Sequence, residues 1–299
     1  MATILINDKV DENLKHRLKN HHDVIEEHYT LDVLINKIKD VDVIIIKSKT
    51  TITRDILDAA KSTNRLKLII RAGVGLDNID AEYAKSKNIK VINTPNSSTN
   101  AVAELALSYM LMMSRNLIQA NKEMHLGIWN KENYIGNELN GKTLGIIGLG
   151  RIGLHLAKIV SVFNMKIVYY DPYSKNDLYE FLDLNELLST SDYISLHLPS
   201  IGENIIKKEH LDIIKKGINL INLARGDLID EEFIIEGIKS KKIKNIALDV
   251  FLSEPHIRKE FLNYENIFLS PHIGAQTIEA QEKISLEILD IINSEFSHV

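Results

Sequence analysis

Ionisable residues follow three short apolar runs in the second half of the chain. Arg225 comes after Ile218–Leu223, Glu254 lies in the run ALDVFLSEP, and His272 lies in LSPHIG. Oxidation of a hydroxyl by hydride loss needs a base whose pKa is near the working pH, and imidazole meets this need. A carboxylate on the far ring nitrogen fixes the tautomer, and an arginine fork matches a substrate carboxylate. The sequence thus predicts a dehydrogenase with His272 as general base and Glu254 as its partner.

A glycine-rich turn precedes these residues. The segment TLGIIGLGRIG, residues 143–153, contains G-x-G-x-x-G between an apolar strand pattern and an apolar helix pattern. Gly148 permits a tight turn, Gly150 lets backbone N–H groups approach a pyrophosphate, and Gly153 lets the helix pack on the strand. The turn predicts a dinucleotide site.

Asp171 follows the next strand pattern, Lys166–Tyr170, at the spacing typical of a carboxylate that accepts from ribose hydroxyls. It would repel a 2′-phosphate, and no arginine follows it before Arg225. We therefore expect NAD as the cofactor and not NADP. The alternative is an ordinary strand-to-helix turn with a solvated aspartate.

Several single residues keep an alternative interpretation. The chain has 11 histidines, most of which we expect on the surface or in the core. For His197 two interpretations are equally open, a packed residue at the end of a strand and a neighbour of the cofactor. Arg225 alone could be a surface arginine, and Asp249 could cap a strand or bind the nicotinamide amide.

Short β-branched runs alternate with amphipathic stretches, which indicates an α/β fold with parallel sheets. A chain of 299 residues favours two domains. A helix is expected over Thr99–Met113 and another over Thr277–Ile292. Strands are expected at Thr3–Ile6, Val41–Ile46, Lys67–Ile70 and Lys90–Ile92, and six more at Thr143–Ile147, Lys166–Tyr170, Tyr193–Leu198, Ile218–Leu223, Asn245–Val250 and Ile267–Leu269.

The composition excludes several classes of protein. With 44% hydrophobic residues the chain can bury a large core, so disorder is excluded. A net charge of -5 argues against general attraction to nucleic acid. The chain has no cysteine, so disulfides and thiolate metal sites are absent, and we expect no metal. No apolar run is long enough for a signal peptide or a membrane span, which predicts a cytoplasmic protein.

The segments NLARGDLIDEEFIIEGIKS, ALDVFLSEP, SPHIGAQTIEAQ and LNGKTLGIIGLGRIG resemble the D-2-hydroxyacid dehydrogenase family, most closely its phosphoglycerate-oxidising members. The resemblance covers nearly the whole chain and is most specific from about Arg71 onward. It implies two doubly wound parallel-sheet domains. A Rossmann NAD-binding domain (98–274) is inserted into a flavodoxin-like substrate domain (1–97 and 275–299).

The resemblance also implies roles for single residues. Arg225 holds the substrate carboxylate and polarises the C2 oxygen, His272 is the general acid/base, and Glu254 is its partner. The expected cofactor contacts are Val74, Gly148, Gly150, Arg151, Ile152, Gly153, Asp171, His197, Leu198, Pro199, Leu223, Ala224, Asp249, His272 and Gly274.

Substrate contacts are expected in the first domain. The turn Gly73-Val74-Gly75 is a weak anion-binding nest by sequence, and the resemblance implies that its amides hold the substrate carboxylate. Lys47 and Lys49 align with a basic loop that carries arginine in relatives, and we expect them to hold the phosphate of 3-phospho-D-glycerate. The alternative is a solvated charged loop. Arg115 is a second possible contributor.

The resemblance implies oxidation of 3-phospho-D-glycerate to 3-phosphohydroxypyruvate, the first step toward serine, with a glyoxylate or hydroxypyruvate reductase as the near alternative. An NAD(H)-sensing corepressor is the alternative outside enzymes. A homodimer through the nucleotide-binding domain is expected, with an arm around Trp129–Ile135. C-terminal regulatory domains are not expected, nor is inhibition by serine through them.

Overall fold

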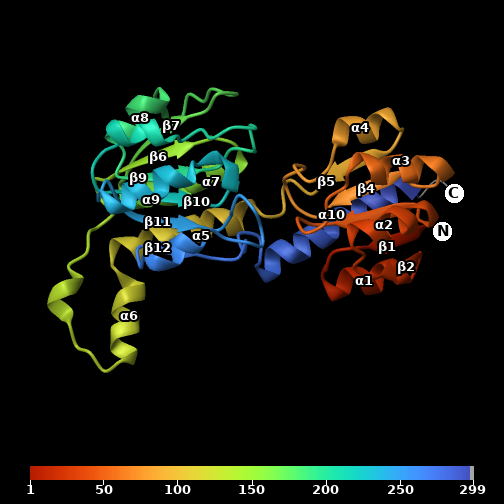
Figure 1. Ribbon diagram of the computed structural model, residues 1–299, viewed down its shortest axis with the longest axis horizontal. Helices are drawn as coiled ribbons and strands as arrows, with labels where there is room; N and C mark the ends of the chain where they lie inside the picture. Colours follow the sequence, from red (N-terminus) through yellow and green to blue (C-terminus); the bar gives the residue numbers. More distant parts are fainter. Residues whose placement is uncertain (297–299) are drawn as a thin grey trace. The chain divides into compact units, whose positions relative to one another are not determined.

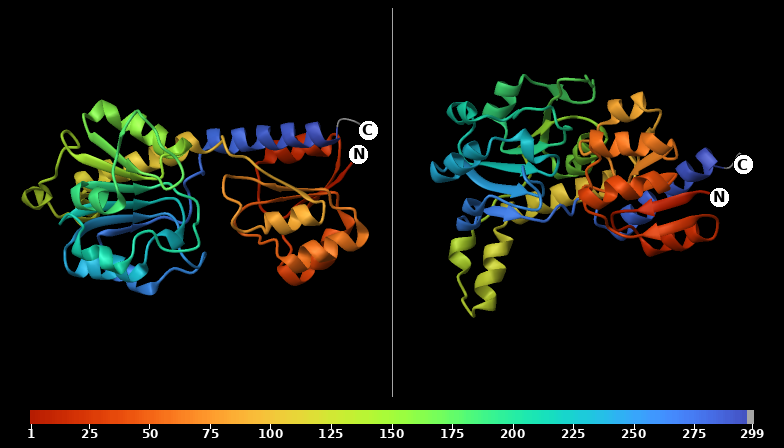
Figure 2. Two further views of the ribbon diagram at one scale, coloured as in Figure 1. Left: turned by 90° about the horizontal axis from the view of Figure 1, so that it is seen from above. Right: turned by 45° about the vertical axis from the view of Figure 1, so that its right-hand side comes forward.

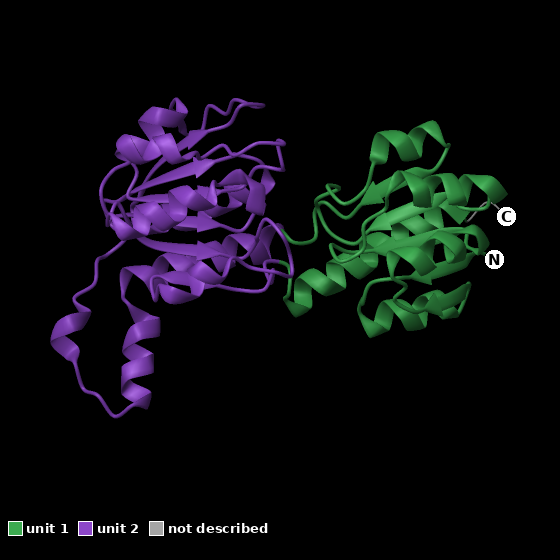
Figure 3. Cartoon of the chain, in the orientation of Figure 1, with its two compact units in different colours: residues 1–98, 275–299 green, residues 99–274 purple. Residues whose placement is uncertain are grey.

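The computed structural model describes residues 1–296, and the chain divides into two compact units (Figure 3). Unit 1 contains Met1–Ser98 and the stretch from Ala275 onward, whereas unit 2 contains Thr99–Gly274. Unit 2 is therefore an insertion into the sequence of unit 1. No helix within residues 1–296 has the length and apolar character needed to cross a bilayer.

Unit 1 is built on a five-stranded parallel sheet with the order β2-β1-β3-β4-β5. This is the flavodoxin-like order, as expected. The C-terminal helix α10 packs beside α1 (Figure 2). Its Ile284, Ile288 and Ile292 belong to the same core as Ile4. The strands are β1 (Thr3–Ile6), β2 (Asp23–Glu26), β3 (Val43–Ile46), β4 (Leu68–Arg71) and β5 (Lys90–Asn93), and the α-helices are α1 (Glu12–Lys19), α2 (Leu31–Lys37), α3 (Arg54–Thr63), α4 (Ala81–Ser86) and α10 (Ile278–Phe296).

Unit 2 is built on a seven-stranded parallel sheet with the order β12-β11-β10-β9-β6-β7-β8 (Figure 1). Read from β6, this is the Rossmann order with one added strand. The strands are β6 (Thr143–Ile147), β7 (Lys166–Tyr170), β8 (Glu180–Phe181), β9 (Tyr193–Leu196), β10 (Ile218–Asn222), β11 (Ile243–Leu248) and β12 (Ile267–Leu269), and the α-helices are α5 (Thr99–Ser114), α6 (Leu117–His125), α7 (Arg151–Val160), α8 (Leu184–Thr190) and α9 (Glu231–Lys239).

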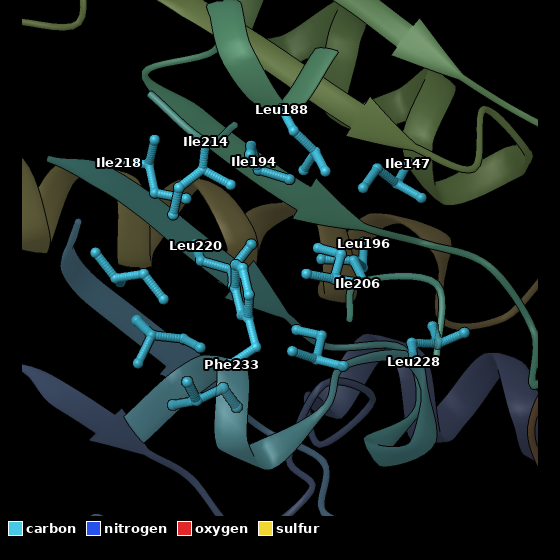
Figure 4. Close-up of a cluster of buried hydrophobic side chains, with 14 of the residues drawn as sticks. Ile147, Leu188, Ile194, Leu196, Ile206, Ile214, Ile218, Leu220, Leu228 and Phe233 are labelled. Atoms are coloured by element: carbon cyan, nitrogen blue, oxygen red, sulfur yellow. The ribbon is translucent and has the colours of Figure 1, made fainter. Parts of the chain in front are cut away.

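Both faces of the unit 2 sheet are buried, which explains why its central strands are apolar at successive positions. Ile147 points into a cluster with Leu196, Leu220 and Phe233, which Figure 4 shows between the sheet and α9. Its neighbour Ile146 belongs to the cluster on the opposite face, under α5 and α7.

Two strands lack the apolar run that predicts a strand from the sequence. The second sheet has seven strands and not the expected six, because β8 is a two-residue exposed edge, Glu180–Phe181, without an apolar run. The strand β2 (Asp23–Glu26) has acids at both ends and only two partly buried residues. Edge strands bury little surface, so their sequences need little hydrophobicity.

The segment after α5 extends away from the body of unit 2 (Figure 1). It contains α6 and a short 3-10 helix at Lys131–Tyr134. We name residues 115–140 the arm. Seven large apolar side chains are exposed along the arm: Leu117, Ile118, Met124, Leu126, Ile128, Trp129 and Ile135. The most exposed are Trp129, at 80%, and Ile135, at 85%.

His197 follows β9, and its Nε2 is 2.9 Å from Ser195 Oγ. Desolvation lowers the pKa of His197 to about 4, so its ring is neutral at pH 7. In an unfolded chain this ring takes up a proton near its ordinary value of 6.5. Between these two pH values the unfolded state binds more protons, so His197 makes the folded state less stable as the pH falls.

We expect the free energy of unfolding to drop between pH 7 and pH 4.5, with His197 contributing on the order of 1–3 kcal/mol. Chemical denaturation at both pH values measures this, and His197→Gln should reduce the drop by that amount. His125→Gln, at an exposed position of α6, should leave the drop unchanged. An undiminished drop in His197→Gln contradicts the assignment.

Candidate active site

The glycine turn between β6 and α7 is shaped by contacts that exclude side chains. Gly148 has φ +95°, and a β-carbon there would lie 2.8 Å from the carbonyl carbon of His197. A β-carbon on Gly153 would lie 2.3 Å from the carbonyl oxygen of Gly148. The space over Gly150 is open, and α7 begins directly after it at Arg151. The turn thus presents a helix N-terminus to open space, which fits a dinucleotide pyrophosphate.

Asp171 connects the end of β7 to this turn. Its carboxylate is buried and accepts from the backbone N–H of Leu149 at 2.8 Å, of Tyr173 at 2.8 Å and of Ser174 at 3.1 Å. A carboxylate offers about four acceptor positions, so Asp171 retains capacity for a ribose hydroxyl. The ribose contact stays a prediction.

His272 and Glu254 form the expected pair. His272 Nδ1 lies 2.8 Å from Glu254 Oε2, and both side chains are about one-third exposed, at 36% and 32%. Desolvation raises the pKa of Glu254, but the hydrogen bond and charge of His272, the N–H of Phe251 and the charge of Arg225 outweigh it and lower this pKa overall. Glu254 is therefore ionised at neutral pH and is suited to orient the imidazole.

Arg225 follows β10, in a loop that Asn222 holds from both sides. Asn222 Nδ2 donates to the carbonyl oxygen of Arg225 at 2.8 Å, and its Oδ1 accepts from Ala224 N–H at 3.1 Å. A β-carbon on Gly226 would lie 2.1 Å from the carbonyl carbon of Phe251. This glycine lets the Arg225 loop approach the loop that carries Glu254, and unit 2 thereby brings all three predicted catalytic residues to neighbouring loops.

Asp249, just after β11, is fully buried. Its carboxylate accepts from Ser270 Oγ at 2.5 Å and from the backbone N–H groups of Ile273 and Gly274, both at 2.8 Å. The structure thus gives Asp249 a contact that neither sequence interpretation anticipated, with the turn around His272. Binding of the nicotinamide amide stays a prediction.

Of the remaining expected cofactor residues, Val74 follows β4 in unit 1, and the others follow strands of unit 2. His197, Leu198 and Pro199 come after β9, and Leu223 and Ala224 come after β10. Arg151 and Ile152 open α7. In a parallel sheet these positions lie at one edge, where ligands bind in doubly wound folds.

In unit 1, Lys47 lies at the end of β3 beside a cavity of about 530 Å³. Its Nζ donates to Gln281 Oε1 at 2.8 Å. Desolvation, helped by the charge of Arg71 and opposed by that of Asp8, lowers the pKa of Lys47. Lys49 is exposed and lines the same cavity, whose lining residues are Asn7, Asp8, Lys9, Val10, Asp11, His28, Lys47, Ser48, Lys49, Gln276 and Gln281.

The turn at Gly73–Gly75 follows β4, also in unit 1. Gly73 has φ +145°, and a β-carbon there would lie 1.6 Å from Arg71 Nη1. The Asn93 side chain donates to the carbonyl oxygen of Val74. Arg71 therefore covers the predicted nest, a placement that the sequence did not reveal.

Three other residues near these groups were missed. Asp8 accepts from Lys47 N–H at 2.6 Å and from Thr50 Oγ1 at 2.7 Å, and it fixes the basic loop. Arg71 ends β4 directly opposite Ile46 at the end of β3, a register that the folded sheet sets. Gln281 lies 234 residues from Lys47, and no local pattern predicts their contact. Arg115 lines a separate cavity of about 390 Å³ within unit 2, with Asn137 and Phe163.

Comparison with known proteins agrees with this geometry. Residues 107–274 match the family described as "D-isomer specific 2-hydroxyacid dehydrogenase, NAD binding domain". A hydroxypyruvate reductase from Thermotoga maritima is 43% identical over 299 residues, covering 97% of each chain. A D-3-phosphoglycerate dehydrogenase from Methanocaldococcus jannaschii is 41% identical over 291 residues, covering 94% of this chain and 55% of the relative.

The chain thus spans about half the length of that phosphoglycerate dehydrogenase. Among solved structures, an NAD-dependent formate dehydrogenase from Staphylococcus aureus in complex with NAD aligns with a TM-score of 0.87 and 29% identity, covering 100% of this chain and 96% of the other. Unit 2 contains the NAD-binding domain, and the chain belongs to the D-isomer specific 2-hydroxyacid dehydrogenase family.

Proposed function

We propose that this chain oxidises 3-phospho-D-glycerate to 3-phosphohydroxypyruvate with NAD, the first step toward serine. The cavity at the end of β3 supports this substrate. Its lining has three lysines, Lys9, Lys47 and Lys49, beside the two acids Asp8 and Asp11, and the charge of Arg71 acts on Lys47. Ammonium groups bind phosphate as point charges, without the bidentate geometry of arginine.

In the proposed reaction His272 takes the C2 hydroxyl proton on Nε2 while Glu254 holds Nδ1. NAD, when bound, accepts the hydride that leaves C2. Arg225 holds the substrate carboxylate and polarises the C2 oxygen, and the backbone amides of Gly73, Val74 and Gly75 bind the same carboxylate. Glu254 stabilises the imidazolium that forms.

The proposed cofactor contacts follow the geometry of unit 2. The N–H groups around Gly150 and Arg151 bind the pyrophosphate, and Asp171 accepts from the adenosine ribose. Asp249 and Gly274 lie on the loops expected beside the nicotinamide.

A second candidate is the reduction of hydroxypyruvate or glyoxylate. It is favoured by the 43% identity to a hydroxypyruvate reductase that matches this chain over 97% of both lengths. The chemistry at His272 is the same, in the reverse direction. The second candidate differs from the first in the direction of the reaction and in a substrate that carries no phosphate.

We also propose a homodimer formed through unit 2. The exposed apolar side chains of the arm, Trp129 and Ile135 above all, form a surface that a second copy would bury.

His272→Gln should lower kcat about 10²- to 10⁴-fold, because the hydroxyl proton then has no base. Glu254→Gln should lower kcat less, about 10- to 100-fold, since the imidazole remains but its orienting charge is lost. Steady-state rates measure both effects, and a fluorescence titration with NADH checks that the cofactor still binds. His16→Gln, at an exposed position of α1, is the control. A His272→Gln variant that keeps wild-type kcat rules out the proposed base.

Asp171→Asn should raise the kcat/KM ratio of NADPH to NADH about 10-fold, because the charge that repels a 2′-phosphate is removed. Asp177→Asn, at an exposed position in the following loop, should not change this ratio. The wild type should strongly prefer NADH. Equal use of both cofactors by the wild type is incompatible with the role of Asp171.

Lys47→Ala should lower kcat/KM for 3-phospho-D-glycerate about 10- to 100-fold and leave that for D-glycerate within about 3-fold, because only the first substrate carries a phosphate. Steady-state kinetics with both substrates measure this, and Lys85→Ala, an exposed lysine on α4, is the matched control. Equal use of the two substrates by the wild type would favour the second candidate.

A further inference from the structure

We propose that Tyr109 and Ser270 are positioning residues that hold the turn bearing His272 through the buried carboxylate of Asp249. The proposal rests on the proposed role of His272 as the general base. It concerns groups in unit 2 alone, and it holds for either candidate substrate.

A chain of hydrogen bonds runs from α5 to this turn. The Tyr109 hydroxyl donates to Ser270 Oγ at 2.7 Å, and the Ser270 hydroxyl donates to Asp249 Oδ1 at 2.5 Å. Asp249 in turn accepts from Ile273 N–H and Gly274 N–H. All three side chains are buried, with Tyr109 and Ser270 at 8% exposure and Asp249 at 0%.

The turn needs such support because His272 has φ +54°, in the left-handed region. A non-glycine residue there costs on the order of 1 kcal/mol or more, and it persists only when its surroundings fix it. Two groups flank the strained residue. The carbonyl oxygen of Ser270 accepts from His272 N–H at 3.1 Å, and Asp249 holds the next two amides.

Helix α5 contacts the same turn at a second point. A β-carbon on Gly274 would lie 3.3 Å from Asp249 Oδ2 and 3.3 Å from Val102 Cγ2. Val102 and Tyr109 therefore connect one helix to both ends of the segment 270–274. The position of His272 relative to the sheet thus depends on α5 as well as on the strands β11 and β12.

Each hydrogen bond between Tyr109, Ser270 and Asp249 has a defined donor and a defined acceptor. The Ser270 hydroxyl donates to Asp249, and its oxygen is then available to accept from Tyr109. Desolvation, helped by the charge of Asp249 and opposed by the bond to Ser270, raises the pKa of Tyr109, so the phenol keeps its proton at neutral pH. Each bond polarises the next, and the loss of the first donor weakens the rest.

The predicted effect is on kcat and not on KM. His272 acts on the proton in the transition state, whereas the proposed carboxylate contacts of the substrate lie elsewhere. A small displacement of a catalytic group lowers the rate without loss of the fold. Tyr109→Phe should lower kcat about 3- to 10-fold with KM within about 2-fold, and Ser270→Ala should lower kcat further.

The experiment compares Tyr109→Phe, Ser270→Ala and Ser270→Thr in the full chain, with the better of the two substrates, 3-phospho-D-glycerate or hydroxypyruvate. Ser270→Thr retains the hydroxyl and should restore most of the kcat. The control is Tyr193→Phe. Tyr193 belongs to the same core cluster as Tyr109 but takes no part in the hydrogen bonds from Tyr109 to Asp249. Hydrogen exchange of the backbone amides of His272, Ile273 and Gly274, which needs no substrate, should become faster in Tyr109→Phe and Ser270→Ala only.

Unchanged kcat and unchanged amide exchange in Tyr109→Phe and Ser270→Ala would overturn the proposal. So would a loss that Tyr193→Phe shares, or a rise in KM alone. The parallel variant His272→Gln separates the two claims. If His272→Gln is fully active, the proposed base is wrong, whereas an inactive His272→Gln beside a fully active Tyr109→Phe refutes only the positioning role.

Discussion

Three buried carboxylates, one in unit 1 and two in unit 2, hold loops at the carboxyl ends of the strands in their own sheet. Asp8, Asp171 and Asp249 come just after β1, β7 and β11. Each accepts at least one backbone N–H from the loop that follows the neighbouring strand, namely β3, β6 and β12. A carboxylate with several N–H donors forms strong, charge-assisted bonds, and its removal would leave buried amides unpaired. The loops that carry Lys47, the glycine turn and His272 depend on these bonds.

The arrangement follows from the parallel sheets. Parallel pairing brings the carboxyl ends of all strands to one edge, so a side chain just beyond one strand reaches the loop of the next. Apolar residues fill both faces of the sheet and leave the ends for polar groups. In unit 2 the same edge has the glycine turn, Arg225, Glu254 and His272. The proposed catalytic residues and the proposed cofactor contacts therefore share one set of supports.

Much of this was visible in the sequence. The long apolar runs predicted the central strands. The glycine turn from Gly148 to Gly153 was recognisable without a structure because its geometry requires glycine at fixed positions. The resemblance to a known family supplied the role of Arg225. The edge strands β2 and β8 were missed because they bury little. The Asp249 network was missed because Tyr109 and Ser270 are 161 residues apart, and only the folded sheet brings them together.

The contact between Val102 and Gly274 also bears on how such a chain is assembled. Unit 2 begins at Thr99 and ends at Gly274, and this contact places its two ends close together. An insert with adjacent ends opens only a short gap in its host, so the loop-closure entropy of the interrupted unit is small. A nucleotide-binding module of this shape is transferable, since a host domain could accept it at a single surface loop and still fold around the break.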